Sequence, residues 1–232
     1  MIDQRKFVIS PLFLLFTGIF ITCLLIANIT AGKIIQVFGN ILPAAIIIFP
    51  ITYIFGDIFT EVYGYERTRL VIWTGFIANL LMVGIFMLTI LLPYPDFWKN
   101  QTAYRIVLGA TPRLMAASLI AYSAGEFTNS FILSKLKVIT HGKKLWMRTI
   151  GSTIVGEGID TILFITIAFF GSLPLPELGK LMVFQYLWKV GYEIMATPVT
   201  YLLVGWVKRH ENMDAFDNRA NYNPFRLGVQ NE

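Results

Sequence analysis

Apolar residues gather along the chain into long runs, which short polar segments interrupt at fairly regular intervals. A helix needs about 20 mostly apolar residues to cross a bilayer, because each residue adds about 1.5 Å. Six runs are long enough: 11–33, 41–64, 69–92, 113–135, 149–172 and 182–207. The pattern predicts an all-α, polytopic membrane protein with six transmembrane helices.

Three regions follow from this pattern. We expect residues 1–10 to form a short N-terminal segment and residues 11–207 to form the membrane domain. Residues 208–232 are a polar tail, which we expect to have little fixed structure. The first run raises the alternative of a cleaved signal peptide, but it stays uncharged well beyond the roughly 7–15 residues of a signal core. We therefore interpret it as a retained first span.

The basic residues predict the orientation. With the N-terminus inside, thirteen of the 19 Lys and Arg fall on the inner side: Arg5, Lys6, Arg67, Arg69, Lys135, Lys137, Lys143, Lys144, Arg148, Lys208, Arg209, Arg219 and Arg226. The outer side holds five: Lys33, Lys99, Arg105, Arg113 and Lys180. Because inner loops carry the excess of Lys and Arg, both termini are expected in the cytoplasm.

Composition excludes an ordinary soluble domain. Hydrophobic residues make up 56% of the chain and charged residues only 14%, against about 25% charged in soluble domains. The net charge of +5 does not indicate nucleic-acid binding, because the basic residues lie between apolar runs or near the C-terminus. The single Cys23 provides no disulfide framework and no thiol metal site, and neither a metal nor a cofactor is expected.

Charged side chains occur inside the apolar runs, where each costs roughly 2.5–3.5 kcal/mol even on the lenient insertion scale. There are seven of them: Asp57, Glu61, Glu126, Glu157, Asp160, Lys189 and Glu193. Buried charges of this kind usually line a polar pathway or a binding site. Membrane transport of a polar solute is therefore the first interpretation.

Two acidic pairs have helical spacing. Asp57 and Glu61 are four residues apart, and Glu157 and Asp160 are three apart, so each pair lies on one helix face. The second pair is expected near mid-membrane, where one acid would hold a proton or face a cation. Glu61 could instead form an interfacial ion pair with the arginines near residues 67–69. The pairs also suggest two inverted three-helix halves, a common transporter plan.

Lys189 has two alternative partners. It could neutralise Glu193, four residues later on the same helix, or pair with Glu157 or Asp160 on another helix. Other polar residues within the apolar runs are also candidates for the binding site: Asn28 in the first run, and Tyr122, Glu126 and Asn129 in the fourth. The two asparagines would either join helices by hydrogen bonds or contact a substrate.

The chain resembles the queuosine-precursor transporters, a bacterial family in the wider vitamin-uptake-transporter group. The resemblance covers about residues 11–207 and rests on four segments: Pro50–Gly64 (PITYIFGDIFTEVYG), Ala121–Gly125 (AYSAG), Gly151–Thr161 (GSTIVGEGIDT) and the region around Lys189. It implies a six-span protein of the bacterial inner membrane that takes up 7-deazaguanine bases. The implied cargo is 7-cyano- or 7-aminomethyl-7-deazaguanine, or queuine.

A guanine-like edge presents two adjacent N–H donors, which an ionised carboxylate accepts as a fork. The hypothesis is that Glu157 or Asp160 binds this edge while Lys189 keeps the other acid charged, and that Asp57 and Glu126 complete the pocket. The aromatic candidates for stacking on the base are Tyr53, Tyr122, Tyr186, Trp188 and Tyr192. Proton or cation coupling through acids such as Glu61 or Glu193 stays open, as does homo-oligomerisation.

Two alternatives remain. The chain could be an intramembrane di-aspartate enzyme that uses Asp57 and Asp160. It could also be a transporter, or the substrate-binding subunit of one, for another small heterocyclic solute.

Overall fold

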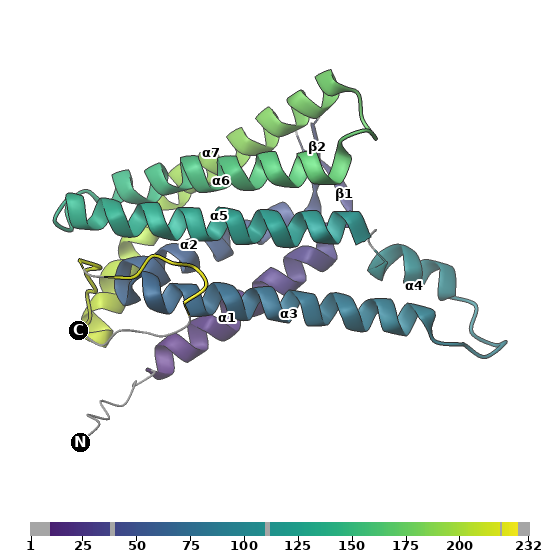
Figure 1. The fold of residues 1–232 in the computed structure, drawn as a ribbon, viewed down its shortest axis with the longest axis horizontal. Coiled ribbons are helices and arrows are strands. Elements are labelled where there is room, and N and C mark those ends of the chain that lie inside the picture. The colour runs from purple at the N-terminus through teal and green to yellow at the C-terminus, as the bar shows by residue number, and fades with distance from the viewer. Residues whose placement is uncertain (1–9, 38–39, 110–111, 219, 227–232) are drawn as a thin grey trace.

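The computed structural model describes residues 10–37, 40–109, 112–218 and 220–226, and shows a bundle of long helices with one short hairpin (Figure 1). Arg5, Lys6 and Arg219, which the orientation prediction counted on the inner side, lie outside the described residues. So does nearly all of the expected segment 1–10.

The elements follow one another with short connections. In chain order they are helix α1 (Pro11–Thr30), strands β1 (Ile34–Val37) and β2 (Asn40–Pro43), a 3-10 turn (Ala44–Ile47), α2 (Phe49–Ile58), a π-helical turn (Phe59–Tyr63), α3 (Tyr65–Leu91), α4 (Gln101–Leu108), α5 (Pro112–Ile139), α6 (Leu145–Phe169) and α7 (Leu175–Glu211). The two strands pair antiparallel, with Ile34 opposite Pro43 and Val37 opposite Asn40.

The second apolar run differs from the expectation of one long helix. Residues 41–64 form the second strand, a 3-10 turn, the ten-residue α2 and the π-helical turn. Two prolines explain the break: Pro43 is extended at the end of β2, and Pro50 lies in the first turn of α2, where its missing N–H leaves no helical bond unmade. Within the described residues, five helical stretches are long and apolar enough to cross a membrane: α1, α3, Gln101–Ile139, α6 and α7.

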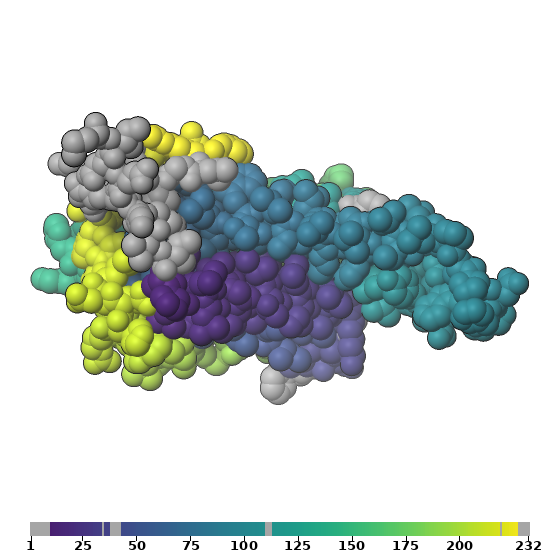
Figure 2. All heavy atoms as spheres, turned by 90° about the horizontal axis from the view of Figure 1, so that it is seen from below, coloured from purple at the N-terminus to yellow at the C-terminus, as the bar shows by residue number. Residues whose placement is uncertain are grey.

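The helices form two layers with α2 between them. Helices α5, α6 and α7 run side by side in one layer, and α1 and α3 lie across from them (Figure 1). The short α2 contacts α1, α5 and α7. Seen from below, α1 and α3 cover the face in view, while α4 projects at one end and the C-terminal residues gather at the other (Figure 2).

Burial differs from that of a soluble protein in two ways. Large apolar side chains such as Leu15, Leu81 and Leu202 are exposed on the outer faces of the helices. Charged side chains such as Arg148 and Glu61 are almost completely buried between them. Apolar surface of this extent is stable only in contact with lipid, so the helical membrane fold follows from the packing as well as from hydropathy.

The expectation that the tail has little fixed structure is wrong for its described part. Residues 212–218 and 220–226 lie against the ends of α3, α5 and α7. The Asp217 carboxylate accepts hydrogen bonds from the Tyr65 backbone N–H (2.9 Å) and the Ser134 hydroxyl. On α3, Arg69 donates to the backbone carbonyls of Asn221 and Asn223 (2.8 and 2.9 Å). These hydrogen bonds to α3 and α5 hold in place a tail segment that is too polar to form a hydrophobic core of its own.

Candidate functional site

A close crossing of α5 and α6 places the central acids. A Cβ added to Gly156 would lie 2.8 Å from the Asn129 Cβ, and one added to Gly125 would lie 2.8 Å from the Asp160 Cβ. Real side chains do not approach so closely, so these two glycines permit the contact. As a result, Asp160 on α6 lies directly against α5.

Lys189 on α7 reaches across to both acids of α6. Its Nζ lies 2.7 Å from the Glu157 Oε2 and also forms an ion pair with Asp160. The three side chains are 7%, 13% and 19% exposed, in the order Lys189, Glu157, Asp160. Of the two alternatives left open by the sequence, Lys189 thus pairs between helices, not with Glu193. We call these three residues the Lys189 cluster; its formal charge is −1 when all three are ionised.

Aromatic rings of α2 line one side of the Lys189 cluster. The Lys189 Nζ lies 5.6 Å from the centroid of the Phe49 ring, which stacks on Tyr53 with a centroid separation of 6.1 Å. The Tyr53 hydroxyl interacts electrostatically with both acids of the cluster. Tyr53 was among the stacking candidates, whereas Phe49 was missed, although it lies four residues earlier on the same helix face.

Glu126 extends the charged region onto α5. Its Oε2 lies 3.5 Å from the position of a Cβ on Gly56 of α2, so it faces that helix closely. It interacts electrostatically with Glu157, Asp160 and Lys189. The structure thus brings Glu126 beside the Lys189 cluster, as the hypothesis requires.

Asp57 and Glu193 form a second group, one helical turn further along α2 and α7 than Tyr53 and Lys189. Asp57 is 1% exposed and Glu193 is fully buried, and their carboxyls interact with each other. The Asn129 side chain also interacts with Asp57. One oxygen of Asp57 and both oxygens of Glu193 are buried without a hydrogen-bond partner among the described residues. We call Asp57 and Glu193 the acid pair.

Glu61 has an entirely different setting. Arg148 donates two parallel hydrogen bonds to its carboxylate, from Nη2 to Oε1 (2.7 Å) and from Nε to Oε2 (3.1 Å). The Lys208 Nζ also lies 2.7 Å from Oε1. Lys137 approaches Oε1 at 3.7 Å and also bonds Asp214. The expected ion pair of Glu61 therefore exists, but its partners come from α5, α6 and α7 and not from residues 67–69. Sequence reasoning counted those three cations only as markers of orientation.

Asn28 joins three helices. Its amide donates to the Asn79 Oδ1 of α3 (2.7 Å), and its Oδ1 accepts from the Ser118 hydroxyl of α5 (2.9 Å). Tyr122 is likewise wedged into a helix contact, because its hydroxyl lies 2.8 Å from the position of a Cβ on Gly75 of α3. Both residues were candidates for substrate contact, and both have packing partners that account for their polar groups.

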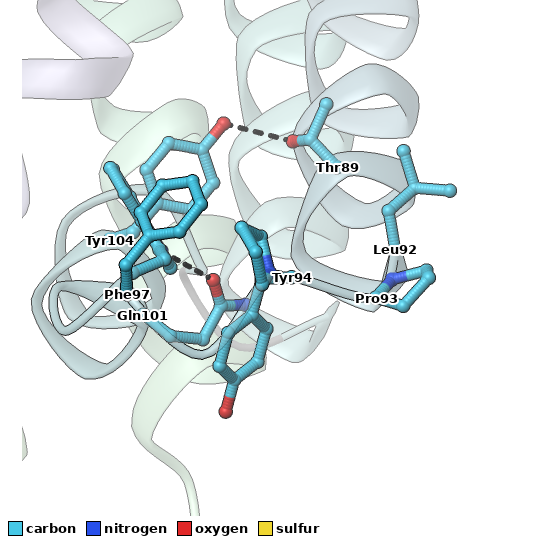
Figure 3. Close-up of a pocket in the computed structure, with 9 residues that line it drawn as sticks. Thr89, Leu92, Pro93, Tyr94, Phe97, Gln101 and Tyr104 are labelled. Atoms are coloured by element: carbon cyan, nitrogen blue, oxygen red, sulfur yellow. Dashed lines mark hydrogen bonds between the residues drawn. The ribbon is translucent and has the colours of Figure 1, made fainter.

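A surface cavity of about 220 Å³ lies away from all these charges, at the connection between α3 and α4 (Figure 3). Tyr94, Phe97 and Tyr104 line it, and a Tyr104–Thr89 hydroxyl hydrogen bond of 3.0 Å closes one side. No charged residue lines it. It therefore does not match a site for a strongly polar solute, and the candidate site remains the buried network.

These features define a class of protein. Several helices are suited to crossing a membrane, and charged side chains from α2, α5, α6 and α7 converge between them, as in carriers of polar solutes. Comparison of the sequence with known families gives the same class: residues 43–203 match the family described as "Putative vitamin uptake transporter". The chain belongs to this family.

Two curated proteins are similar to this chain in sequence. The chain is 27% identical to the "Probable queuosine precursor transporter" of Bacillus subtilis (strain 168) over 177 residues, which cover 75% of this chain and 77% of the relative. It is 25% identical to the "Queuosine precursor transporter" of Escherichia coli (strain K12) over 124 residues, which cover 53% of each. No solved structure matches the chain significantly.

Proposed function

We propose that this protein is a multi-pass transporter of the bacterial inner membrane that imports a queuosine precursor, a 7-deazaguanine base, for tRNA modification. The names of both relatives and the family match support this function. The observation that carries it is the Lys189 cluster: two acids and one lysine, largely buried, beside the stacked rings of Phe49 and Tyr53.

The chemistry of the cluster suits such a base. One carboxylate accepts the adjacent N–H donors of the guanine-like edge, while Lys189 keeps the second carboxylate charged. A flat heterocycle also needs an aromatic surface, which α2 supplies next to the charges. Glu126 faces the same space from α5 and adds an acceptor. We assign substrate binding to Glu157, Asp160, Lys189 and Glu126.

The alternative of a di-aspartate enzyme has less support. Such an enzyme needs two aspartates that share one site. Here Asp160 has Lys189 as its partner, whereas Asp57 has Glu193. The two aspartates therefore belong to different groups of contacts.

Our proposal includes the orientation. Both termini lie in the cytoplasm, and the hairpin, α2 and the π-helical turn together form the sixth crossing, because α2 alone is too short for a bilayer of about 30 Å. Cysteine labelling tests this arrangement. A membrane-impermeant reagent added to intact cells is expected to label Lys180→Cys but not Lys143→Cys, and the reverse pattern contradicts it.

Uptake in cells tests the function. The host lacks its own precursor synthesis and its own precursor transporter, each 7-deazaguanine precursor is supplied at low concentration, and queuosine is measured in tRNA. We expect the wild type to restore queuosine and Asp160→Asn or Lys189→Met to lower the uptake rate by about 10- to 100-fold, since each removes a charge-assisted bond of roughly 1.5–3 kcal/mol.

The matched control is Glu177→Gln, which neutralises an acid of α7 that is 56% exposed and paired with Lys180. It is expected to transport like the wild type. Variants are compared at equal amounts in the membrane. No queuosine from any precursor, with a well-inserted wild-type protein, would refute the proposed cargo.

A further inference from the structure

The acid pair is not explained by cargo binding. Asp57 and Glu193 come from α2 and α7, lie against each other, and have almost no exposure. Among the described residues, no salt bridge reaches either carboxyl, and three of their four oxygens are buried without a hydrogen-bond partner. Burying two adjacent ionised carboxylates without a cation is very costly.

The groups around the acid pair make the burial of two negative charges more costly still. From α5, Glu126 and the neutral Asn129 face Asp57, and from α6 Glu157 acts on Glu193. Lys189 precedes Glu193 by one turn on α7 but is bound to Glu157 and Asp160. Among the described residues, the charged groups that act most strongly on the acid pair are therefore acidic.

One bound proton lowers the cost of burying the two carboxyls. A proton shared between two facing carboxyls removes one negative charge and supplies a hydrogen bond between them, as in the carboxyl dyads of aspartic proteases. We propose that Asp57 and Glu193 bind one proton between them, and that this is the proton which drives uptake. The second part rests on the proposed function as a transporter.

The position of the acid pair explains how a proton would act on cargo. Asp57 lies one helical turn after Tyr53 on α2, and Glu193 lies one turn after Lys189 on α7. Each helix thus carries one acid of the pair and one residue at the Lys189 cluster. While the proton is bound, the acid pair holds α2 and α7 together. When it leaves, two carboxylates repel each other across the same contact, which separates the two walls of the cargo site.

The first test needs no cargo. Infrared spectroscopy of the purified protein at neutral pH distinguishes a protonated carboxyl from an ionised one by its carbonyl stretch. We expect the double variant Asp57→Asn/Glu193→Gln to lose one protonated carboxyl relative to the wild type, whereas Glu177→Gln loses none. An unchanged protonated-carboxyl signal in the double variant overturns the proposal, because the acid pair would then be fully ionised.

The second test measures coupling in proteoliposomes with radiolabelled 7-cyano-7-deazaguanine. An inward proton gradient is expected to drive accumulation by the wild type and by Glu177→Gln, and a protonophore is expected to abolish it. Glu193→Gln and Asp57→Asn are expected to reduce this gradient-driven accumulation at least tenfold. Both variants replace a carboxyl by an amide of the same shape, and their folding is checked by gel filtration.

Accumulation by Glu193→Gln equal to that of the wild type, or wild-type accumulation that follows a sodium gradient and not a proton gradient, overturns the coupling role. Exchange of labelled for unlabelled base without any gradient measures transport itself. Absence of exchange in the wild type is a failure of the proposed cargo, and the infrared result still decides whether the acid pair binds a proton.

Discussion

Asp57 and Glu61 lie four residues apart in one buried segment, yet they have opposite surroundings. Glu61 receives a fork from Arg148 and a second cation, Lys208. Asp57 faces another acid, Glu193, and a neutral amide, Asn129. The comparison shows that the role of a buried acid depends on what the neighbouring helices bring to it. A satisfied acid fastens helices together, whereas an unsatisfied one is available to bind a proton.

The largest effect expected from this comparison is on stability. Glu61→Gln leaves buried cations without their anion, and breaking a buried pair in this way typically costs about 3–5 kcal/mol. Asp57→Asn removes no cation's partner, so its cost is expected to stay within about 1 kcal/mol. Thermal unfolding in detergent compares the two variants directly, since both change a carboxyl to an amide on the same segment.

A large drop in unfolding temperature for Glu61→Gln with little change for Asp57→Asn sharpens the contrast. Equal drops would break it, because they would mean that Asp57 contributes as much to stability as the ion-paired Glu61. The amount of protein in the membrane provides a second measure, as unstable variants are degraded.

A smaller effect is expected at Asp214, which contacts Lys137 and Lys208, two of the cations around Glu61, from the exposed side. Burial raises the pKa of Asp214, but hydrogen bonds from Lys137 and Lys208 outweigh it, and the pKa lies below its ordinary value. A lowered pKa in the folded state means that the stabilisation is complete above the ordinary value, about 4, and is lost as the pH falls through the lowered one.

Because the Asp214 side chain is 45% exposed, we expect its contribution to stay below about 1 kcal/mol. Hydrogen exchange of residues 212–218 is the measurement. In the wild type, protection is expected to be constant from pH 8 to 5 and to fall in stronger acid. Asp214→Asn is expected to show weaker protection at neutral pH. Equal protection in both proteins at neutral pH would mean that this contact does not hold the tail.

The charged residues that the sequence proposed for the site were easy to find, because an acid or a lysine within an apolar run is conspicuous, and the structure brings Glu126, Glu157, Asp160 and Lys189 together. It also placed Glu157 and Asp160 on one face, since their spacing of three is a local property of a helix. The partner of Lys189 could not be chosen, because that choice depends on how α6 and α7 pack. For the same reason Arg148, counted as a marker of orientation, was not recognised as the partner of Glu61.

Two features of the fold were misjudged for different reasons. The broken second run had a visible signal, since Pro43 and Pro50 lie near its start, but hydropathy averaged over the run hides them. The tail had no such signal. Its polar composition is typical of disordered segments, and its order comes from contacts such as the Trp73 indole N–H with the Pro224 carbonyl, at 2.7 Å. Contacts of this kind depend on α3 already being in place.

The docking of residues 212–218 and 220–226 has a consequence for how the protein is made. Its hydrogen-bond and ion-pair partners on the π-helical turn, α3, α5 and α7 precede it in the chain and therefore leave the ribosome first. Until this segment is synthesised, the cations around Glu61 lack Asp214 and the Arg69 guanidinium lacks its two carbonyls. This end of the bundle is thus completed only after helices α1 to α7 have been synthesised, so premature termination within this segment would leave an inserted but unfinished protein for quality control to recognise.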